Sequence, residues 1–175
     1  QFLELADKFL GFYNELPFSE SPSDKYRYYL NNGSYNYYDG IILYSFIRLL
    51  KPKRIIEVGS GFSSALIIDT CETFLKDKTK LTFIDPYPDT LIRRVLRNED
   101  KHRYHILNKR VQEVPMDIFC SLEKNDILFI DSSHVSKFGS DVNHLLFKVM
   151  PLLTEGVIIH FHDIFYPFEY PKNWI

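Results

Sequence analysis

From residue 51 onward, short apolar runs alternate with segments of helical periodicity. Five runs have the length and near-continuous hydrophobicity of buried strands: Ile55–Val58, Lys80–Ile84, Tyr104–Leu107, Asp126–Ile130 and Gly156–Phe161. The intervening segments predict four helices: Ser63–Lys76, Thr90–Arg97, Met116–Leu122 and Ser136–Leu153. Strands that alternate with helices predict an α/β fold, a doubly wound and mainly parallel sheet with helices on both faces.

The first fifty residues follow a different pattern. Phe2, Leu5, Phe9, Phe12 and Leu16 recur at helical spacing, which predicts an amphipathic helix over residues 1–16 that prolines at 17 and 22 terminate. A tyrosine-rich stretch over 26–44 follows, and Gly40–Leu50 is predicted to be a helix. The aromatic residues of this stretch are interpreted as packed side chains, as the wall of a pocket, or as an interface. We therefore expect one domain over 1–175, with an N-terminal cap segment at 1–50 and an α/β core at 51–175.

Composition narrows the possible partners and the compartment. A net charge of −2 gives no reason to expect nucleic acid. No apolar run is long enough to span a bilayer, and no signal-peptide pattern opens the chain. Cys71 and Cys120 lie in apolar, helix-like segments and are predicted to be buried thiols of a reducing compartment, so we expect a cytoplasmic protein. A homodimer is compatible with the sequence, and the lack of an initiating Met together with the end at Ile175 suggests a fragment.

The stretch around Glu57-Val58-Gly59-Ser60-Gly61 predicts a strand, a tight turn and the start of a helix. Glycine allows a ligand to approach the main chain, and the first N–H groups of the helix face the turn. Ser63 and Ser64 are candidate N-cap residues of the same cradle. Because the third glycine of the dinucleotide motif is absent, an ordinary strand–turn–helix with a surface glutamate is the alternative.

Ligands of such sheets bind at the carboxyl ends of the strands. Asp85 follows the second strand, where a carboxylate can accept both hydroxyls of a ribose. Its alternative role is to begin the turn at Pro86. Val111, Gln112 and Glu113 follow the third strand, and an adenine edge is expected there.

A second group of polar residues follows the fourth and fifth strands. Asp131, His134, His162 and Asp163 are expected on neighbouring strand tips. Carboxylates and an imidazole could bind a divalent cation, with Asp131 and Asp163 as ligands, or one of these groups could act as a general base. The alternative is that Asp131 and His134 only order a loop. Either His160 or His162 is expected to be a packed core residue, and Asp141 is expected to be structural, at a helix N-terminus.

From about Asp39 to Trp174 the chain resembles the Rossmann-like class I S-adenosylmethionine-dependent methyltransferases, in particular the methyltransferase-24 family. The resemblance rests on Lys51–Ser64, on Ile84-Asp-Pro-Tyr-Pro, on Leu128-Phe-Ile-Asp-Ser-Ser-His and on the stretch from Pro151 to His162-Asp-Ile-Phe. It implies S-adenosylmethionine as the cofactor. Class I folds usually close with an antiparallel hairpin, for which Ile164–Ile175 leaves little chain.

The resemblance also implies roles for individual residues. Glu57, Gly59, Ser60 and Gly61 would meet the methionine part of the cofactor, Asp85 its ribose, and Asp131 the region of the transferable methyl group. Related sugar and macrolide O-methyltransferases place metal-binding acids at positions comparable to Asp131 and Asp163, which implies Mg²⁺ or a similar cation.

The sequence therefore predicts a methyltransferase that acts on a hydroxyl of a small molecule or a sugar, with the base among Asp131, His134 and His162. A nicotinamide-dependent oxidoreductase and a non-catalytic interaction module are the alternatives. Glu57 and the missing glycine argue against the first of these.

Overall fold

The computed structural model describes the chain except for residues 1, 77, 90–93, 166–168, 170–171 and 173–175. Its centre is a five-stranded sheet of order β3-β2-β1-β4-β5, in which every neighbouring pair is parallel. The strands are β1 (Arg54–Val58), β2 (Lys80–Ile84), β3 (His105–Leu107), β4 (Ile127–Ile130) and β5 (Ile158–Phe161). The strand order reverses between β1 and β4, so the carboxyl ends of these two strands flank the position where open parallel sheets bind ligands.

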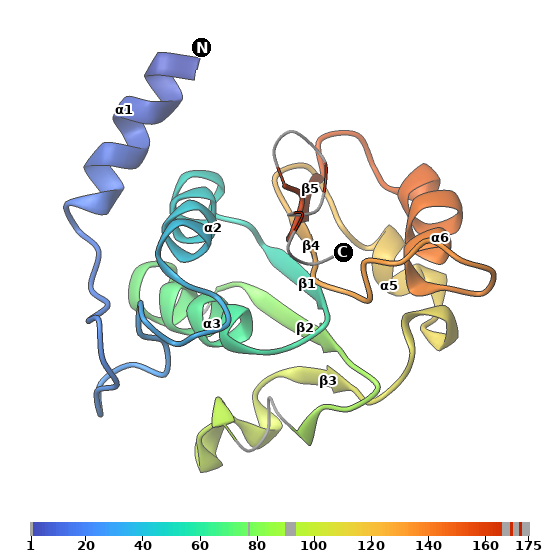
Figure 1. Ribbon diagram of the computed structural model, residues 1–175, viewed down its shortest axis with the longest axis horizontal. Coiled ribbons are helices and arrows are strands. Elements are labelled where there is room, and N and C mark those ends of the chain that lie inside the picture. Colours follow the sequence, from blue (N-terminus) through green and yellow to red (C-terminus); the bar gives the residue numbers. More distant parts are fainter. Residues whose placement is uncertain (1, 77, 90–93, 166–168, 170–171, 173–175) are drawn as a thin grey trace.

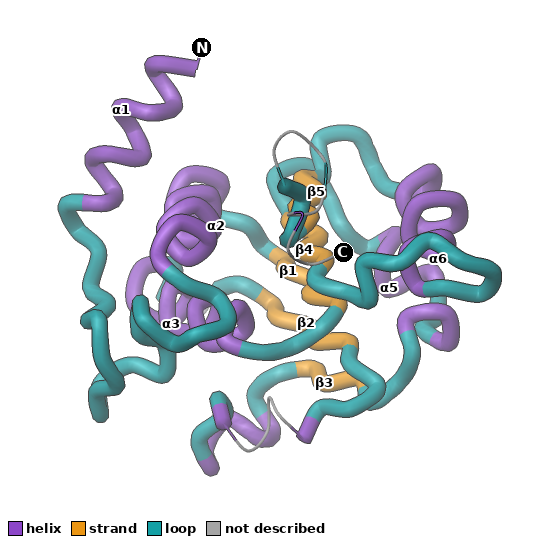
Figure 2. The backbone as a smooth tube through the Cα atoms, in the orientation of Figure 1, coloured by secondary structure: helices purple, strands orange, loops and turns teal. Residues whose placement is uncertain are grey.

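Helices cover both faces of the sheet (Figures 1 and 2). One face carries α2 (Tyr37–Leu50) and α3 (Phe62–Phe74), and the other carries α5 (Met116–Cys120) and α6 (Asp141–His144). α6 continues as a π-helical turn over Leu145–Val149 and a 3-10 turn over Met150–Leu152. Two further 3-10 turns span Asn98–His102 and Val111–Glu113. Successive side chains of a strand point to opposite faces, so Ile55 joins the core under α2 and α3 while Ile56 and Val58 join the core under α5 and α6.

The N-terminal segment is packed onto the α2–α3 face. α1 (Phe2–Tyr13) contacts α2 through Phe9 and Phe46, whose ring centroids lie 5.1 Å apart. Tyr28, Tyr35 and Tyr44 are buried in the core, so the interpretation of the tyrosine-rich stretch as an interface is wrong for these three residues. No helix in the described part of the chain is long and apolar enough to cross a membrane.

A buried arginine fastens the N-terminal segment to the core. The Arg27 guanidinium donates to Asp69 at 2.6 Å and to Glu72 and Asp100 at 2.8 Å, and its side chain is 4% exposed. The Asp69 carboxylate also accepts the backbone N–H groups of Arg27 and Tyr28, at 2.6 and 2.8 Å. Three carboxylates, on α3 and on the 98–102 turn, thus bind the guanidinium of Arg27 and hold the N-terminal segment against the core.

The five predicted strands are present, and most differences concern helices. The helix predicted from Ser136 begins at Asp141, because Ser140 caps it by accepting the N–H of Asn143 and Gly139 leads into the cap at φ 72°. Half of the helix predicted over Thr90–Arg97, residues 90–93, lies outside the described residues. Cys71 is buried as predicted, whereas Cys120 is exposed at the end of the short helix α5, where Phe119 fills the buried position.

Candidate functional site

The turn after β1 is built around Gly59. Its φ is 86°, and a Cβ at this position would lie 1.7 Å from the carbonyl oxygen of Asp131. The Gly59 N–H donates to the carbonyl of Ile84 at 2.9 Å, and the Asp131 N–H donates to that of Val58 at 2.8 Å. Only glycine combines this backbone angle with so close an approach of β4, so the predicted bend is present and tightly fixed.

Gly61 plays a different part in the same turn. Its backbone is extended, and a Cβ placed there would meet nothing within 4 Å. The position occupies the N-cap of α3, which begins at Phe62. Neither strain nor packing against the protein calls for glycine at 61, so this residue leaves open space beside the helix N-terminus.

Glu57 lies beneath the turn. Its carboxylate is fully buried and accepts the hydroxyls of Ser63, at 2.5 Å, and Ser64. Burial raises the pKa of Glu57 to about 8, although the two hydroxyls oppose that shift.

The structure changes the N-cap role predicted for two of these residues. Glu57 is fully buried and lines neither of the two hollows described below. Ser63 and Ser64 are not N-cap residues: they lie inside the first turn of α3, and their hydroxyls bind Glu57. The alternative of a surface glutamate is also wrong, because Glu57 supports the turn from below.

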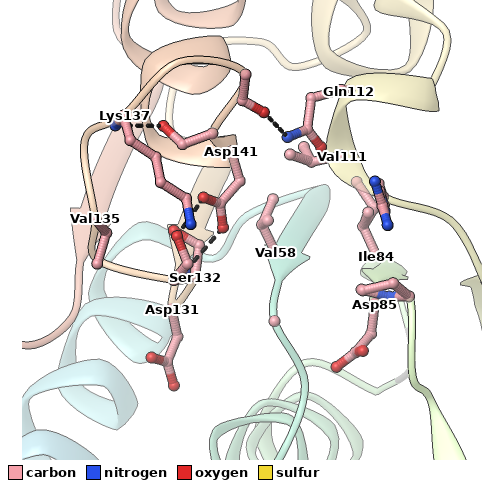
Figure 3. A pocket seen from close by; sticks show the side chains of 16 residues that line it. Val58, Ile84, Asp85, Val111, Gln112, Asp131, Ser132, Val135, Lys137 and Asp141 are labelled. Atoms are coloured by element: carbon pink, nitrogen blue, oxygen red, sulfur yellow. Dashed lines mark hydrogen bonds between the residues drawn. The ribbon is translucent and has the colours of Figure 1, made fainter.

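A cleft of about 450 Å³ opens at the carboxyl ends of β1, β2 and β4 (Figure 3). It is lined by Val58, Gly59, Ile84, Asp85, Pro86, Arg110, Val111, Gln112, Asp131, Ser132, Ser133, Val135, Lys137, Gly139, Ser140 and Asp141. Asp85 and Asp131 stand on opposite sides of the end of β1, as Figure 3 shows. The cleft has the size and the mixture of apolar and polar walls that small-molecule sites have.

Asp85 organises the rim of this cleft. Its carboxylate accepts the N–H of Ser60 at 3.0 Å and that of Tyr87 at 2.6 Å. Each oxygen keeps a second lone pair, which a ligand hydroxyl could use. Both predicted roles of Asp85 are thus compatible, since the residue shapes the turn and faces the cleft.

Gln112 and Val111 lie across the cleft from Asp131, on the 3-10 turn after β3. The Gln112 amide donates to the carbonyl of Gly139 at 2.9 Å and so ties that turn to the 131–140 loop (Figure 3). Glu113 is not among the described lining residues. Asp141 accepts the N–H of Ser133 at 2.8 Å and its hydroxyl at 2.5 Å, which agrees with the structural role predicted for it.

A second hollow, of about 220 Å³, lies on the other side of the turn. It is lined by Ser34, Tyr35, Ser60, Gly61, Phe62, Ser63, Arg94, Val95 and Asp131. The Tyr35 hydroxyl and Ser60 Oγ are buried, and neither has a hydrogen-bond partner within the described part of the chain. Asp131 lines both hollows, so one carboxylate joins them. Tyr35 belongs to the tyrosine-rich stretch, for which the wall of a pocket was one interpretation, and it does line this hollow.

The acids and histidines predicted at the ends of β4 and β5 do come together. His134 Nε2 lies 3.2 Å from Asp131 Oδ1 and 3.6 Å from Asp163 Oδ2. His162 Nδ1 lies 3.4 Å from Asp131 Oδ1 and 3.5 Å from Asp163 Oδ2. His134 and Asp163 have φ values of 59° and 58°, a conformation that costs energy outside glycine and that collects at functional sites.

Asp39 joins this cluster from the first turn of α2. Its Oδ2 lies 3.7 Å from Nε2 of His162, whose other ring nitrogen faces Asp131 and Asp163. For Asp39, the only signal in the sequence was its position in the tyrosine-rich stretch. Both histidines of β5 and its end are packed: the ring of His160 lies 4.9 Å from that of Phe129, and the buried His162 ring lies 4.9 Å from that of Tyr35. Burial lowers the pKa of His160, and the neighbouring His162 adds to that shift.

The charges within the cluster stabilise one another. Burial alone would raise the pKa of Asp131, but His162 and His134 outweigh it and hold that pKa below its usual value. Burial would lower the pKa of His162, yet Asp131, Asp163 and Asp39 raise it. Asp131 is therefore ionised at neutral pH. Ligand atoms of Asp131, His162 and Asp163 lie within 4.8 Å of one another, a separation that one cation could bridge.

Comparison with known proteins gives a consistent result. The family described as "Methyltransferase domain" matches residues 56–164. An uncharacterized protein of Archaeoglobus fulgidus is 35% identical over 124 residues, which cover 67% of this chain and 54% of that protein. The chain thus spans about half the length of this relative.

Two solved structures share the fold at low identity. The structure described as "cmcI-N160 SAH" has a TM-score of 0.55 and 18% identity, and the match covers 93% of this chain and 79% of that one. The SAH-bound Podospora anserina methyltransferase PaMTH1 has a TM-score of 0.53 and 19% identity, with 92% and 62% covered. The Rossmann-like fold expected from the sequence is confirmed.

Proposed function

Since the chain belongs to the methyltransferase-domain family, we propose that it binds S-adenosylmethionine and transfers the methyl group to a hydroxyl of a small molecule, such as a sugar. The observation that carries the proposal is the placement of Asp85 and Asp131 on opposite sides of the Gly59 turn, at the rim of one cleft. The descriptions of the two solved structures named above both mention SAH, which supports the choice of cofactor.

The residues present fit an adenosyl sulfonium compound. Asp85 would accept the ribose hydroxyls, and Val111 and Gln112 would border the adenine. The amino-acid end would enter the second hollow, where Gly61 leaves open space and the Ser60 hydroxyl has no partner within the described part of the chain. When bound, this cofactor supplies an electrophilic methyl group on sulfur.

The protein's own contribution would be placement and proton removal. Holding two reactants in line removes much of the entropic cost of a bimolecular displacement. His134 is partly exposed beside Asp131, so it could take the proton of an acceptor hydroxyl while the Asp131 carboxylate stabilises the imidazolium. This arrangement supports oxygen as the methylated atom, because a hydroxyl needs a base to become a good nucleophile.

Asp131, Asp163 and His162 would hold a divalent cation. The donor set consists of two carboxylates and one imidazole within 4.8 Å, which suits Mg²⁺ or Mn²⁺. When bound, such a cation lowers the pKa of a coordinated hydroxyl. Asp39, 3.7 Å from His162 Nε2, would hold the proton on that nitrogen and so leave Nδ1 available as a ligand.

The test of the proposal is isothermal calorimetry with S-adenosylhomocysteine and, separately, NAD⁺. We expect binding of S-adenosylhomocysteine alone, weakened about tenfold or more in Asp85→Ala because a charge-assisted hydrogen bond is lost. Asp7→Asn, on α1 and remote from the cleft, serves as the control. Binding of NAD⁺ without S-adenosylhomocysteine would support an oxidoreductase, and binding of neither would support a non-catalytic module.

A further inference from the structure

An apolar groove lies between α2 and β5. It has a volume of about 250 Å³ and is lined by Leu43, Phe46, Ile127, Ile158, Ile159, His160 and Phe161. Six of these seven side chains are hydrocarbon, so the groove offers little to a polar ligand. β5 is the last strand of the sheet, and in the described part of the chain no further strand pairs with its outer edge (Figure 1). The groove is therefore a site for apolar groups beside an open strand edge.

α2 forms one wall of the groove and begins at the cluster of acids and histidines. Asp39, in its first turn, places Oδ2 3.7 Å from Nε2 of His162. Leu43 follows four residues later and Phe46 three residues after that, a spacing that puts all three on one face of the helix. These seven residues of helix span about 10 Å. Phe46 also packs against Phe9 of α1, with ring centroids 5.1 Å apart, so the N-terminal helix supports the far end of this wall.

β5 forms the other wall and leads to the same cluster. Alternate residues of a strand share a face, and Ile158 packs against the core under α2 and α3. The rings of His160 and His162 lie on this face too, 4.9 and 6.4 Å from the ring of Phe129. His162 continues the strand, since its backbone N–H donates to the carbonyl of Ile130 at 2.9 Å. Both walls thus connect the groove with the reactive groups.

The groove is too small to be a complete ligand site. Sites for small molecules have volumes of about 300–1,000 Å³ and several polar groups that fix the orientation of the ligand. This groove has about 250 Å³ and a single polar side chain, that of His160. A groove of this kind, next to reactive groups, suits the apolar part of a molecule whose polar part lies at the cluster.

Exposed apolar side chains also flank the cluster. Tyr38 precedes Asp39 in the chain and is 85% exposed, and Ile164 follows Asp163 and is 62% exposed. Ile42, one helical turn after Tyr38, is exposed as well. Single apolar residues are common on a protein surface, but these three neighbour one reactive cluster. They provide apolar surface that a bound acceptor could cover.

We propose that the groove binds an apolar tail of the acceptor, so that the methylated molecule is amphipathic. Its hydroxyl would lie at Asp131 and His134, and its hydrocarbon tail would lie between α2 and β5. The inference rests on the proposed function and narrows the class of acceptor from small hydroxyl compounds to those that carry a hydrocarbon chain.

Alkyl glucosides are the probe, because they share one sugar and differ only in the length of the tail. Calorimetry with methyl, butyl, hexyl and octyl β-glucoside, each below the concentration at which micelles form, would measure binding to wild-type protein in the presence of S-adenosylhomocysteine. We expect the dissociation constant to fall by up to about fourfold for each methylene that enters the groove, because the burial of a methylene is favourable. Equal affinity for all four glucosides would overturn the inference.

Variants locate the tail. Ile158→Phe narrows the groove without adding a polar group, so we expect it to lose most of the gain from methyl to octyl glucoside and to bind methyl glucoside unchanged. Phe147→Ser is the matched control, because it removes a 73%-exposed aromatic side chain on the face of the sheet that carries α6. This control should keep the whole gain. Ile158→Ser is a second variant at the same wall, for use if the melting temperature shows that Ile158→Phe is not folded.

Binding of S-adenosylhomocysteine separates this inference from the proposed function. Wild-type protein that binds it but shows no gain with tail length, or an equal gain in the groove variant and in Phe147→Ser, would overturn the inference while the proposed function stands. A dimer in sedimentation that excludes octyl glucoside would overturn it too, because a second copy would then occupy the groove. Wild-type protein that does not bind S-adenosylhomocysteine would overturn the proposed function, and with it the role of the groove in binding an acceptor.

Discussion

A side chain at position 59 would begin 1.7 Å from the carbonyl oxygen of Asp131, so the turn after β1 and the end of β4 are in direct backbone contact. Gly59 therefore forms the part of the cleft wall that lies between Asp85 and Asp131. Because φ at Gly59 is also 86°, both the backbone angle and the available space exclude other residues.

Gly59→Ala should destabilise the fold by about 2 kcal/mol or more, because it adds a strained backbone angle to an overpacked contact. Urea unfolding would measure the loss. Gly61→Ala is the matched control, since a Cβ at 61 meets nothing within 4 Å. We expect this control to fold with wild-type stability and to bind S-adenosylhomocysteine more weakly, because its methyl group enters the second hollow. Equal stability of the two variants would contradict the role given to Gly59.

Glu57 should make stability depend on pH. The ordinary pKa of its carboxyl is 4.5, and burial raises that pKa to about 8 in the folded protein. Between these values the folded state keeps a proton that the unfolded state has lost, so stability falls as pH rises. The stabilisation is complete below about pH 4.5 and is lost by about pH 8, a change on the order of 5 kcal/mol.

Glu57→Gln removes this titration and keeps the shape of the side chain. Urea midpoints of wild type and variant, measured from pH 5 to 9, should therefore diverge, with the wild type losing stability relative to the variant as pH rises. Parallel profiles would show that the carboxyl titrates normally in the folded protein.

The strands were predictable because a buried parallel strand is a near-continuous apolar run. Ile127–Ile130 is apolar throughout, and Ile55–Val58 is apolar except for Glu57. The strand-end acids followed from the same reasoning. The orientation of the Glu57 side chain was not predictable, because an acid inside a strand has the same sequence pattern whether it faces a ligand or two serines of the next helix. The sequence offered a pocket wall as one interpretation of the stretch that contains Tyr35, but it could not single out this tyrosine, because the ring is positioned by packing against Phe129 and His162.

Arg27 should be among the residues whose loss costs most stability. Arg27→Met would leave Asp69 and Asp100, which are 1% and 0% exposed, without their cation, and we expect a loss of about 3–5 kcal/mol. The exposed pair of Lys53 and Glu123, 3.4 Å apart, provides the control. Lys53→Met should change stability by less than about 1 kcal/mol. Thermal and urea unfolding of both variants would measure the difference. A similar loss of stability in both variants would mean that the buried ion pairs of Arg27 contribute no more than an exposed pair.

Metal binding at the β4 and β5 ends can be tested without an acceptor. Mn²⁺ is the probe, and its binding is followed by electron paramagnetic resonance or calorimetry. The proposed ligands are Asp131, His162 and Asp163. Asp131→Asn and Asp163→Asn each remove one carboxylate from this set, so we expect Mn²⁺ affinity to fall at least tenfold in either variant. Asp39→Asn should give a smaller loss, because Asp39 acts only through the ring of His162. Asp117→Asn, an exposed acid on α5, should bind as the wild type does. The cluster is not a cation site if wild type and all four variants bind Mn²⁺ equally, or if none of them binds it. In that case, the acceptor hydroxyl would be activated by His134, which would remove its proton beside Asp131.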